Sequence, residues 1–160
     1  MLEIEHKFLL KAEDESWRAQ AVRHVELVQG YLATGRTTVR VRLQSDKPEG
    51  ILCIKGEEAG LARQEFEYRI PAAEARAMLD GLCDGRTVAK TRFYVPAEEE
   101  GLMWEIDAYH GPFEGHYTAE LEVPSAETPF QRPSWLGREV SDNLRYRNAA
   151  LAAAQRWPDE

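Results

Sequence analysis

The amino-acid sequence predicts an α+β fold, a single domain over residues 1–160 that is dominated by an antiparallel sheet. In most segments, apolar and polar residues alternate with a period of two, which is typical of strands with chemically different faces. Two stretches instead have the composition of helices. A length of 160 residues fits one domain, and no linker, internal repeat or low-complexity segment interrupts the chain.

The predicted elements follow in order along the chain. The alternating segments predict strands at residues 2–10, 24–33, 37–44, 51–56, 62–70, 87–95, 102–109 and 117–123. A helix is predicted at 72–82, because Pro71 can open it, strong helix formers fill it and Asp84-Gly85 follows it. The Ala-rich stretch 147–157 predicts a second helix, and the prolines and serines of 125–136 predict a loop.

Composition excludes several classes of function. The chain has 20 Lys and Arg against 28 Asp and Glu, a net charge of −8, which argues against binding to nucleic acid or membranes through long-range charge. No apolar run is long enough to span a membrane, and charges interrupt the amino terminus, so it does not read as a secretory signal. Cys53 and Cys83 have no metal-ligand spacing, and we expect buried, reduced thiols. These absences predict a cytoplasmic protein.

The charges on the predicted strands are sorted by sign. Acidic pairs at i, i+2 are Glu3/Glu5, Glu65/Glu67, Glu105/Asp107 and Glu120/Glu122; the basic residues are Lys7, Arg40/Arg42, Lys55 and Lys90/Arg92. A solvent-exposed sheet face with cross-strand ion pairs is the simplest explanation. Against it, like charges at this spacing lie only about 7 Å apart and repel one another unless something neutralises them.

A curled or closed sheet would bring both sets of charges into one polar interior. A polyphosphate with divalent cations would satisfy such a lining, since Arg and Lys bind phosphate oxygens and paired carboxylates hold Mg²⁺ or Mn²⁺. From the residues alone, the sequence predicts a site for metal and polyanion without choosing the ligand.

The ordered set of motifs resembles the CYTH superfamily, the triphosphate tunnel metalloenzymes. The amino-terminal E-x-E-x-K signature is matched by Glu3-Ile4-Glu5-His6-Lys7, and QGYL by Gln29–Leu32. The charged pairs follow in the family's order, with Lys55 in an IKG motif, and the stretch from Leu136 to Asn148 resembles the carboxyl end of short bacterial members. The resemblance therefore covers nearly the whole chain.

The resemblance implies an eight-stranded antiparallel β-barrel that forms a tunnel, with a few flanking helices, and hydrolysis of inorganic triphosphate to pyrophosphate and phosphate. It implies a role for each of the charged positions, with two Mg²⁺ or Mn²⁺ ions as cofactors. Substrate binding falls to Lys7, Arg40, Arg42, Lys55, Lys90 and Arg92. Metal binding falls to Glu3, Glu5, Glu120 and Glu122, with Glu65, Glu67 and Asp107 as weaker candidates for a second metal or for orienting the cations. Lys7 and Tyr31 are the predicted catalytic pair.

Alternatives stay open at this point. A class IV adenylate cyclase would share the tunnel, and thiamine or nucleoside triphosphatases rank below it. A polyphosphate-binding module without turnover is the non-enzymatic alternative, although such a protein gains little from so many carboxylates. The expected partner is a small-molecule triphosphate, with no nucleic acid and no membrane, and the prediction allows a homodimer.

Overall fold

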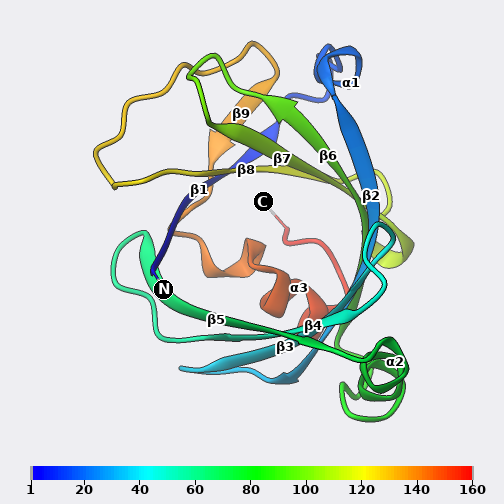
Figure 1. The fold of residues 1–160 in the computed structure, drawn as a ribbon. Coiled ribbons are helices and arrows are strands. Elements are labelled where there is room, and N and C mark those ends of the chain that lie inside the picture. Colours follow the sequence, from blue (N-terminus) through cyan, green and yellow to red (C-terminus); the bar gives the residue numbers. More distant parts are fainter. Residues whose placement is uncertain (1, 160) are drawn as a thin grey trace.

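In the computed structural model, which describes residues 2–159, eight antiparallel strands close into a barrel (Figure 1). Around the barrel the order is β1-β5-β4-β3-β2-β6-β7-β8 and back to β1. The two end residues of the predicted 1–160 domain lie outside the described residues. The strands are β1 (Leu2–Leu10), β2 (Arg23–Ala33), β3 (Thr38–Gln44), β4 (Gly50–Lys55), β5 (Ala62–Ile70), β6 (Thr87–Pro96), β7 (Met103–Tyr109), β8 (Tyr117–Glu122) and β9 (Leu136–Glu139).

Strand β1 closes the barrel. Its first residues pair with β5, with Glu3 opposite Arg63, while the stretch from Glu5 onward pairs with β8 on the other side. Beyond the end of β5, the short strand β9 takes over the free side of β1, with Phe8 opposite Glu139. The predicted eight-stranded antiparallel barrel is therefore confirmed, with β9 as an addition that the alternation did not indicate.

The helices are short and lie outside the sheet or at its end. They are α1 (Trp17–Gln20), α2 (Ala72–Gly81) and α3 (Asn148–Ala154), with 3₁₀ turns η1 (Gly111–Phe113) and η2 (Leu144–Tyr146). The predicted helix 72–82 is confirmed to within one residue. The prediction of a helix over 147–157 was wrong at its end: Gln155 adopts a left-handed conformation (φ 53°), and Trp157 packs its ring on Tyr109, Tyr146 and His116 instead.

The apolar core lies on the outer face of the barrel. Because side chains alternate along each strand, the charged residues face inward and their apolar neighbours face outward. On β7, for example, Trp104 and Ile106 are almost completely buried. They pack in one cluster with Phe8 of β1 and with Trp135, which lies in the loop just before β9. The core is thus formed between the barrel and the segments that cover it, which leaves the interior free for polar groups.

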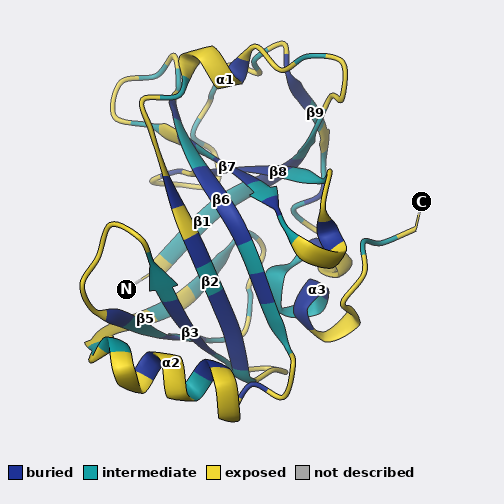
Figure 2. Ribbon diagram, turned by 90° about the vertical axis from the view of Figure 1, so that its right-hand side faces the viewer, coloured by how far each residue is buried: buried dark blue, intermediate teal, exposed yellow. Residues whose placement is uncertain are grey.

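Helix α2 covers the outer face of β2, β3 and β4 (Figure 2). Its Ala75 and Leu79, with Cys83 just beyond it, pack on Val41, while the opposite face of the helix is exposed. A Cβ atom at Gly30 would lie 2.6 Å from the Cys83 sulfur. The glycine of the QGYL motif therefore allows the close approach of α2 to β2.

Helix α3 lies at one end of the barrel and, in the view of Figure 1, inside the ring of strands. Its Leu151 and Ala152 are fully buried against Tyr31, Val88 and Tyr109, whose side chains come from barrel strands. The carboxyl-terminal segment therefore forms part of the wall at this end of the interior.

None of the helices in residues 2–159 is long and apolar enough to cross a membrane.

Candidate active site

A cavity of about 840 Å³ occupies the barrel interior. Every site residue predicted from the sequence lines it, with the exception of Asp107. The closed sheet thus brings together side chains that are spread over more than a hundred positions of the chain. The predicted residues in its lining are Glu3, Glu5, Lys7, Tyr31, Arg40, Arg42, Lys55, Glu65, Glu67, Lys90, Arg92, Glu120 and Glu122.

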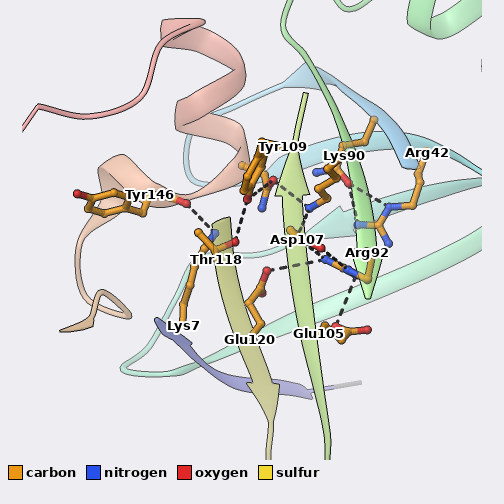
Figure 3. A network of polar contacts seen from close by, with 12 residues as sticks. Lys7, Arg42, Lys90, Arg92, Glu105, Asp107, Tyr109, Thr118, Glu120 and Tyr146 are labelled. Carbon is orange, nitrogen blue, oxygen red and sulfur yellow. Dashed lines mark hydrogen bonds and ion pairs between the residues drawn. The ribbon is translucent and has the colours of Figure 1, made fainter. Parts of the chain in front are cut away.

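One side of the cavity, which we call the basic wall, consists of Arg40 and Arg42 on β3 and Lys90 and Arg92 on β6. Asp107 of β7 lies behind this wall and anchors two of its members (Figure 3). Its carboxylate accepts from Lys90 Nζ at 2.7 Å and from Arg92 Nε and Nη2 at 2.8 and 2.9 Å. Because Asp107 is fully buried and both its oxygens are engaged, these contacts favour orientation of the cations over metal binding.

Burial and the anchoring carboxylate act on the pKa values of this wall. Burial lowers the pKa of Lys90 to about 7, and the attraction of Asp107 offsets it only in part. Burial acts on Arg92 in the same sense, but Asp107 outweighs it and holds the pKa of Arg92 well above its usual range. The pKa of Arg42 falls to about 10 through burial and the nearby Arg40, so Arg42 remains charged at neutral pH.

The arginines of β3 differ in their partners. Arg42 donates from Nε and Nη2 to the Gln29 side-chain oxygen at 3.0 and 2.8 Å. The buried Nε of Arg40, by contrast, has no hydrogen-bond partner within the described part of the chain. A buried donor without a partner costs folding free energy, so Arg40 is a group that an anionic ligand in the cavity would satisfy.

The other side, which we call the acidic wall, consists of Glu3 and Glu5 on β1, Glu65 on β5, and Glu120 and Glu122 on β8. The barrel register places Glu5 directly opposite Glu122. Burial raises the pKa of Glu65 to about 7, and its hydrogen bond with Glu3 adds to that rise. Burial also raises the pKa of Glu122, with further contributions from the charges of Glu3 and Glu105.

Two carboxyl groups of the acidic wall interact directly. Burial and the neighbouring Glu120 charge raise the pKa of Glu5 well above its usual range. Burial would raise that of Glu120 as well, but the Lys7 ammonium and the hydrogen bond from Glu5 hold it well below. The opposite directions of these two pKa values favour a hydrogen bond in which Glu5 donates to Glu120, so that the two carboxyl groups share one proton.

Lys55 lies among these acids. Its ammonium contacts Glu3 at 2.8 Å. Burial would raise the pKa of Glu3, but Lys55 and the hydrogen bond from Glu65 together lower it. Arg63 approaches the same carboxylate at 3.9 Å. Glu120 also faces a protein cation, Arg92, at 3.8 Å. Glu122, by contrast, is a member of no ion pair found among the described residues.

A cluster of three side chains on β4 and β5 has the geometry that could hold a metal ion. The sulfur of Cys53 and carboxylate oxygens of Glu65 and Glu67 lie within 4.8 Å of one another. Cys53 is free and buried, as expected, and donates to Glu65 at 3.4 Å. Burial raises its pKa to about 11, so the thiol is protonated at neutral pH. The sequence reasoning missed its place in this group, although Cys53 stands two residues before Lys55 on the same strand face.

Lys7 and Tyr31, the predicted catalytic pair, both line the cavity, but the hydrogen bonds of their side chains are formed with other residues and not with each other. Lys7 Nζ donates to the Tyr146 carbonyl at 2.6 Å, and the Tyr31 hydroxyl contacts Gln29 Nε2 at 3.0 Å. Tyr31 is 3% exposed, and its backbone N–H donates to the Arg86 carbonyl. Each side chain therefore has a fixed position at the cavity that does not depend on the other.

The carboxyl-terminal segment supplies residues that the sequence reasoning did not assign. Asn148 Oδ1 accepts from Lys90 Nζ at 3.0 Å and from the Tyr109 hydroxyl at 3.3 Å, so it shares the anchoring of the basic wall. Arg147 forms an ion pair with Glu58 of the β4–β5 loop, and both line the cavity. Arg147 and Asn148 were marked in the sequence only by their place in or beside the carboxyl-terminal motif, and Glu58 lies in a loop without any motif.

Fold and lining together define a charged β-barrel of the CYTH type. The family model described as the CYTH domain matches residues 1–154, and the chain belongs to this family. The predicted resemblance is thereby confirmed.

Named relatives are similar over nearly their whole length. The inorganic triphosphatase of Acetivibrio thermocellus is 38% identical over 150 residues, covering 93% of this chain and 92% of its own. The inorganic triphosphatase of Nitrosomonas europaea is 36% identical over 154 residues, which cover 95% of this chain and 97% of that protein. The crystal structure of the inorganic triphosphatase NE1496 superposes with a TM-score of 0.66 at 31% identity, over 94% of this chain and 93% of that one.

Proposed function

We propose that this protein hydrolyses inorganic triphosphate to pyrophosphate and phosphate within the barrel. The observation that carries the proposal is the division of the cavity into a basic wall anchored by buried partners and an acidic wall of crowded carboxylates. A triphosphate with divalent cations presents complementary charge to both. The relatives named inorganic triphosphatase support the same substrate.

The cavity lining favours inorganic triphosphate over a nucleotide. Tyr31 contributes the one aromatic ring among the described residues that line it. A nucleobase is usually held by stacking on aromatic or arginine planes and by a pocket with apolar character. The cyclase alternative needs such a pocket for adenine. A Hippeastrum protein that is described as an adenylyl cyclase with a dominant triphosphatase activity is similar at 16% identity, which supports the fold alone.

The residues present fit divalent metal ions. The acidic wall offers hard carboxylate oxygens, which Mg²⁺ and Mn²⁺ prefer, and three of its carboxyl groups have pKa values raised by burial and crowding, so a bound cation would relieve repulsion. Glu3, Glu5, Glu120 and Glu122 would hold one ion, and Glu65 with Glu67 a second. When bound, such ions neutralise phosphate oxygens and lower the pKa of a coordinated water.

The protein's own residues would position the substrate. Lys90 and Arg92 are held in place by Asp107, so their donors need little reorganisation when a phosphate group arrives. Arg40, with its unpartnered Nε, and Arg42 would bind a neighbouring phosphate group. Lys7 and Lys55, placed among the acids, would contact phosphate oxygens beside the metal ions. Hydrolysis of this kind depends mainly on alignment and on stabilisation of charge.

A substrate comparison tests this proposal. Purified protein is incubated with tripolyphosphate, ATP and thiamine triphosphate, each with Mg²⁺, Mn²⁺ or EDTA, while phosphate and cyclic AMP are measured. Release of phosphate from tripolyphosphate far ahead of the other two, and only with metal, is the expected result. Cyclic AMP with pyrophosphate would identify a cyclase, and binding without turnover a polyphosphate-binding module.

A cytoplasmic location is part of the proposal. Both cysteines are free and buried, which fits a reducing compartment. Fractionation of cells that carry a tagged chain is the test, and recovery outside the cytoplasm would contradict it.

A further inference from the structure

Gln29 lies behind the cavity between two of its functional residues. It stands on β2 two positions before Tyr31, so both side chains point to the same face of the strand. Its side chain is completely buried. The amide accepts from Arg42 at 3.0 and 2.8 Å and contacts the Tyr31 hydroxyl at 3.0 Å, so it connects the basic wall to the tyrosine.

The direction of these hydrogen bonds follows from the chemistry of the groups. A guanidinium has only donors, so the oxygen of the Gln29 amide must face Arg42. The amide nitrogen, which has only donors too, must then face Tyr31. The Tyr31 hydroxyl oxygen therefore accepts this bond, and its own hydrogen is left to point in another direction.

That other direction leads to the cavity. The ring of Tyr31 packs against Leu151 of α3 and Val88 of β6. The backbone carbonyl of Tyr31 accepts from the Arg86 guanidinium at 3.2 and 3.3 Å. Tyr31 lines the cavity, and its hydroxyl lies close enough to the cavity residues Arg40 and Arg42 to act on their pKa values. A hydroxyl hydrogen directed there meets the space in which a phosphate oxygen would lie.

We propose that Gln29 is a positioning residue that fixes Arg42 and makes the Tyr31 hydroxyl a hydrogen-bond donor to a triphosphate oxygen. The proposal rests on the proposed function and assigns Tyr31 the role of donor instead of base. Arg42, Gln29, Tyr31 and the substrate then form one chain of hydrogen bonds with a single direction. A side chain at position 29 that accepts a hydrogen bond from Tyr31 would reverse the direction of the bond between these two residues.

Gln29→Glu makes that reversal with nearly the same shape. The carboxylate still accepts from Arg42, but it also accepts from Tyr31 and draws the hydroxyl hydrogen away from the cavity. Kinetics with tripolyphosphate are measured for four proteins: wild type, Gln29→Glu, Tyr31→Phe and the double variant. Gln64→Glu, on the exposed part of β5, adds the same charge outside the cavity and is the matched control.

We expect Tyr31→Phe and Gln29→Glu each to lower kcat/KM by about ten- to a hundredfold, the range for one hydrogen bond to a charged group. In the Tyr31→Phe background, Gln29→Glu should cost less than about threefold, because the link that it reverses is already absent. Equal costs in both backgrounds would overturn the proposal, since a purely structural or charge effect does not depend on the hydroxyl. Thermal unfolding of each variant shows whether it is folded, and Gln29→Met replaces Gln29→Glu if it is not.

Failure of the proposed function is distinguishable from failure of this inference. If the wild type does not hydrolyse tripolyphosphate, the proposed function fails, and the same four proteins are compared by calorimetric binding of tripolyphosphate. The inference would be upheld if Gln29→Glu raises the Kd in the wild-type background but not in the Tyr31→Phe background. Equal effects in both backgrounds, or no binding by the wild type, would overturn it.

Discussion

The basic wall and the acidic wall of the cavity are built on different principles. Each anchored cation of the basic wall has a buried protein partner, such as Asp107 for Lys90 and Arg92. In the acidic wall, carboxyl groups lie directly against one another: Glu5 interacts with Glu120, and Glu65 with Glu3. Glu3 and Glu120 also pair with protein cations, and this crowding raises the pKa of Glu5. Lys90 and Arg92 of the basic wall are therefore positioned by the protein itself, whereas the proposed function assigns the neutralisation of the acidic wall to metal ions.

The largest effect should come from removing a carboxylate of the acidic wall. We expect Glu122→Gln to abolish metal-dependent hydrolysis of tripolyphosphate, by more than about a hundredfold, because even an indirect metal contact is worth about 10–100-fold. The melting temperature should hardly change, since Glu122 forms no ion pair in the described structure. Glu100→Gln, which neutralises an exposed loop carboxylate, is the control; near-normal activity of Glu122→Gln would remove this residue from the metal site.

Removing the anchor of the basic wall should act on stability first. Asp107→Asn removes the buried carboxylate that Lys90 and Arg92 share, and loss of one member of a buried ion pair costs about 3–5 kcal/mol. For a chain of this length, each kcal/mol corresponds to about 2–4 °C in melting temperature. Thermal unfolding measures the loss, with the exposed Asp80→Asn on α2 as control. An unchanged melting temperature would show that the basic wall does not depend on its anchor.

The smallest effect is a dependence of stability on pH in the metal-free protein. The raised pKa of Glu65, about 7 against an ordinary 4.5, means that the folded protein holds a proton there that the unfolded chain has lost. Stability should therefore fall as pH rises through this window. The raised values of Glu5 and Glu122 act in the same sense. The lowered pKa of Lys90 acts in the opposite sense, but only above about pH 7.

Melting temperatures of the metal-free protein between pH 5 and pH 7 check this prediction. A fall of a few degrees is expected, at about 2–4 °C for each kcal/mol, and saturating Mg²⁺ should reduce it. Glu65→Gln should flatten the curve. A stability that rises with pH over this range would show that these carboxyl groups are not crowded.

Alternation predicted the strands and the residues of the charged face, whereas the closed eight-stranded barrel was predicted from the resemblance to the CYTH superfamily. Alternation along each strand places charged residues on one face, and closure of the sheet by β1 brings those faces together. The strand boundaries agree to within one residue, and the membership of the cavity follows from the same signal. The short elements α1 and β9 could not be predicted, because four residues carry too little periodicity.

The partners of the charged residues could not be predicted in the same way. Alternation indicates which face a residue occupies, but not that Asp107 would lie behind Lys90 or that Gln29 would reach Arg42. Those contacts depend on the register between strands and on burial. Asn148 lies on a segment without alternation at all, and its contact with Lys90 depends on how α3 enters the end of the barrel.

The most direct test of the account is a calorimetric titration of the metal-free protein with Mn²⁺ in buffers of different ionisation enthalpy. Because carboxylates must lose their protons to bind a metal, the account predicts that Mn²⁺ binds with release of protons near neutral pH, and that Glu5→Gln reduces this release. Binding without proton release, or no binding at millimolar Mn²⁺, would contradict the claim that the acidic wall is built to receive a cation.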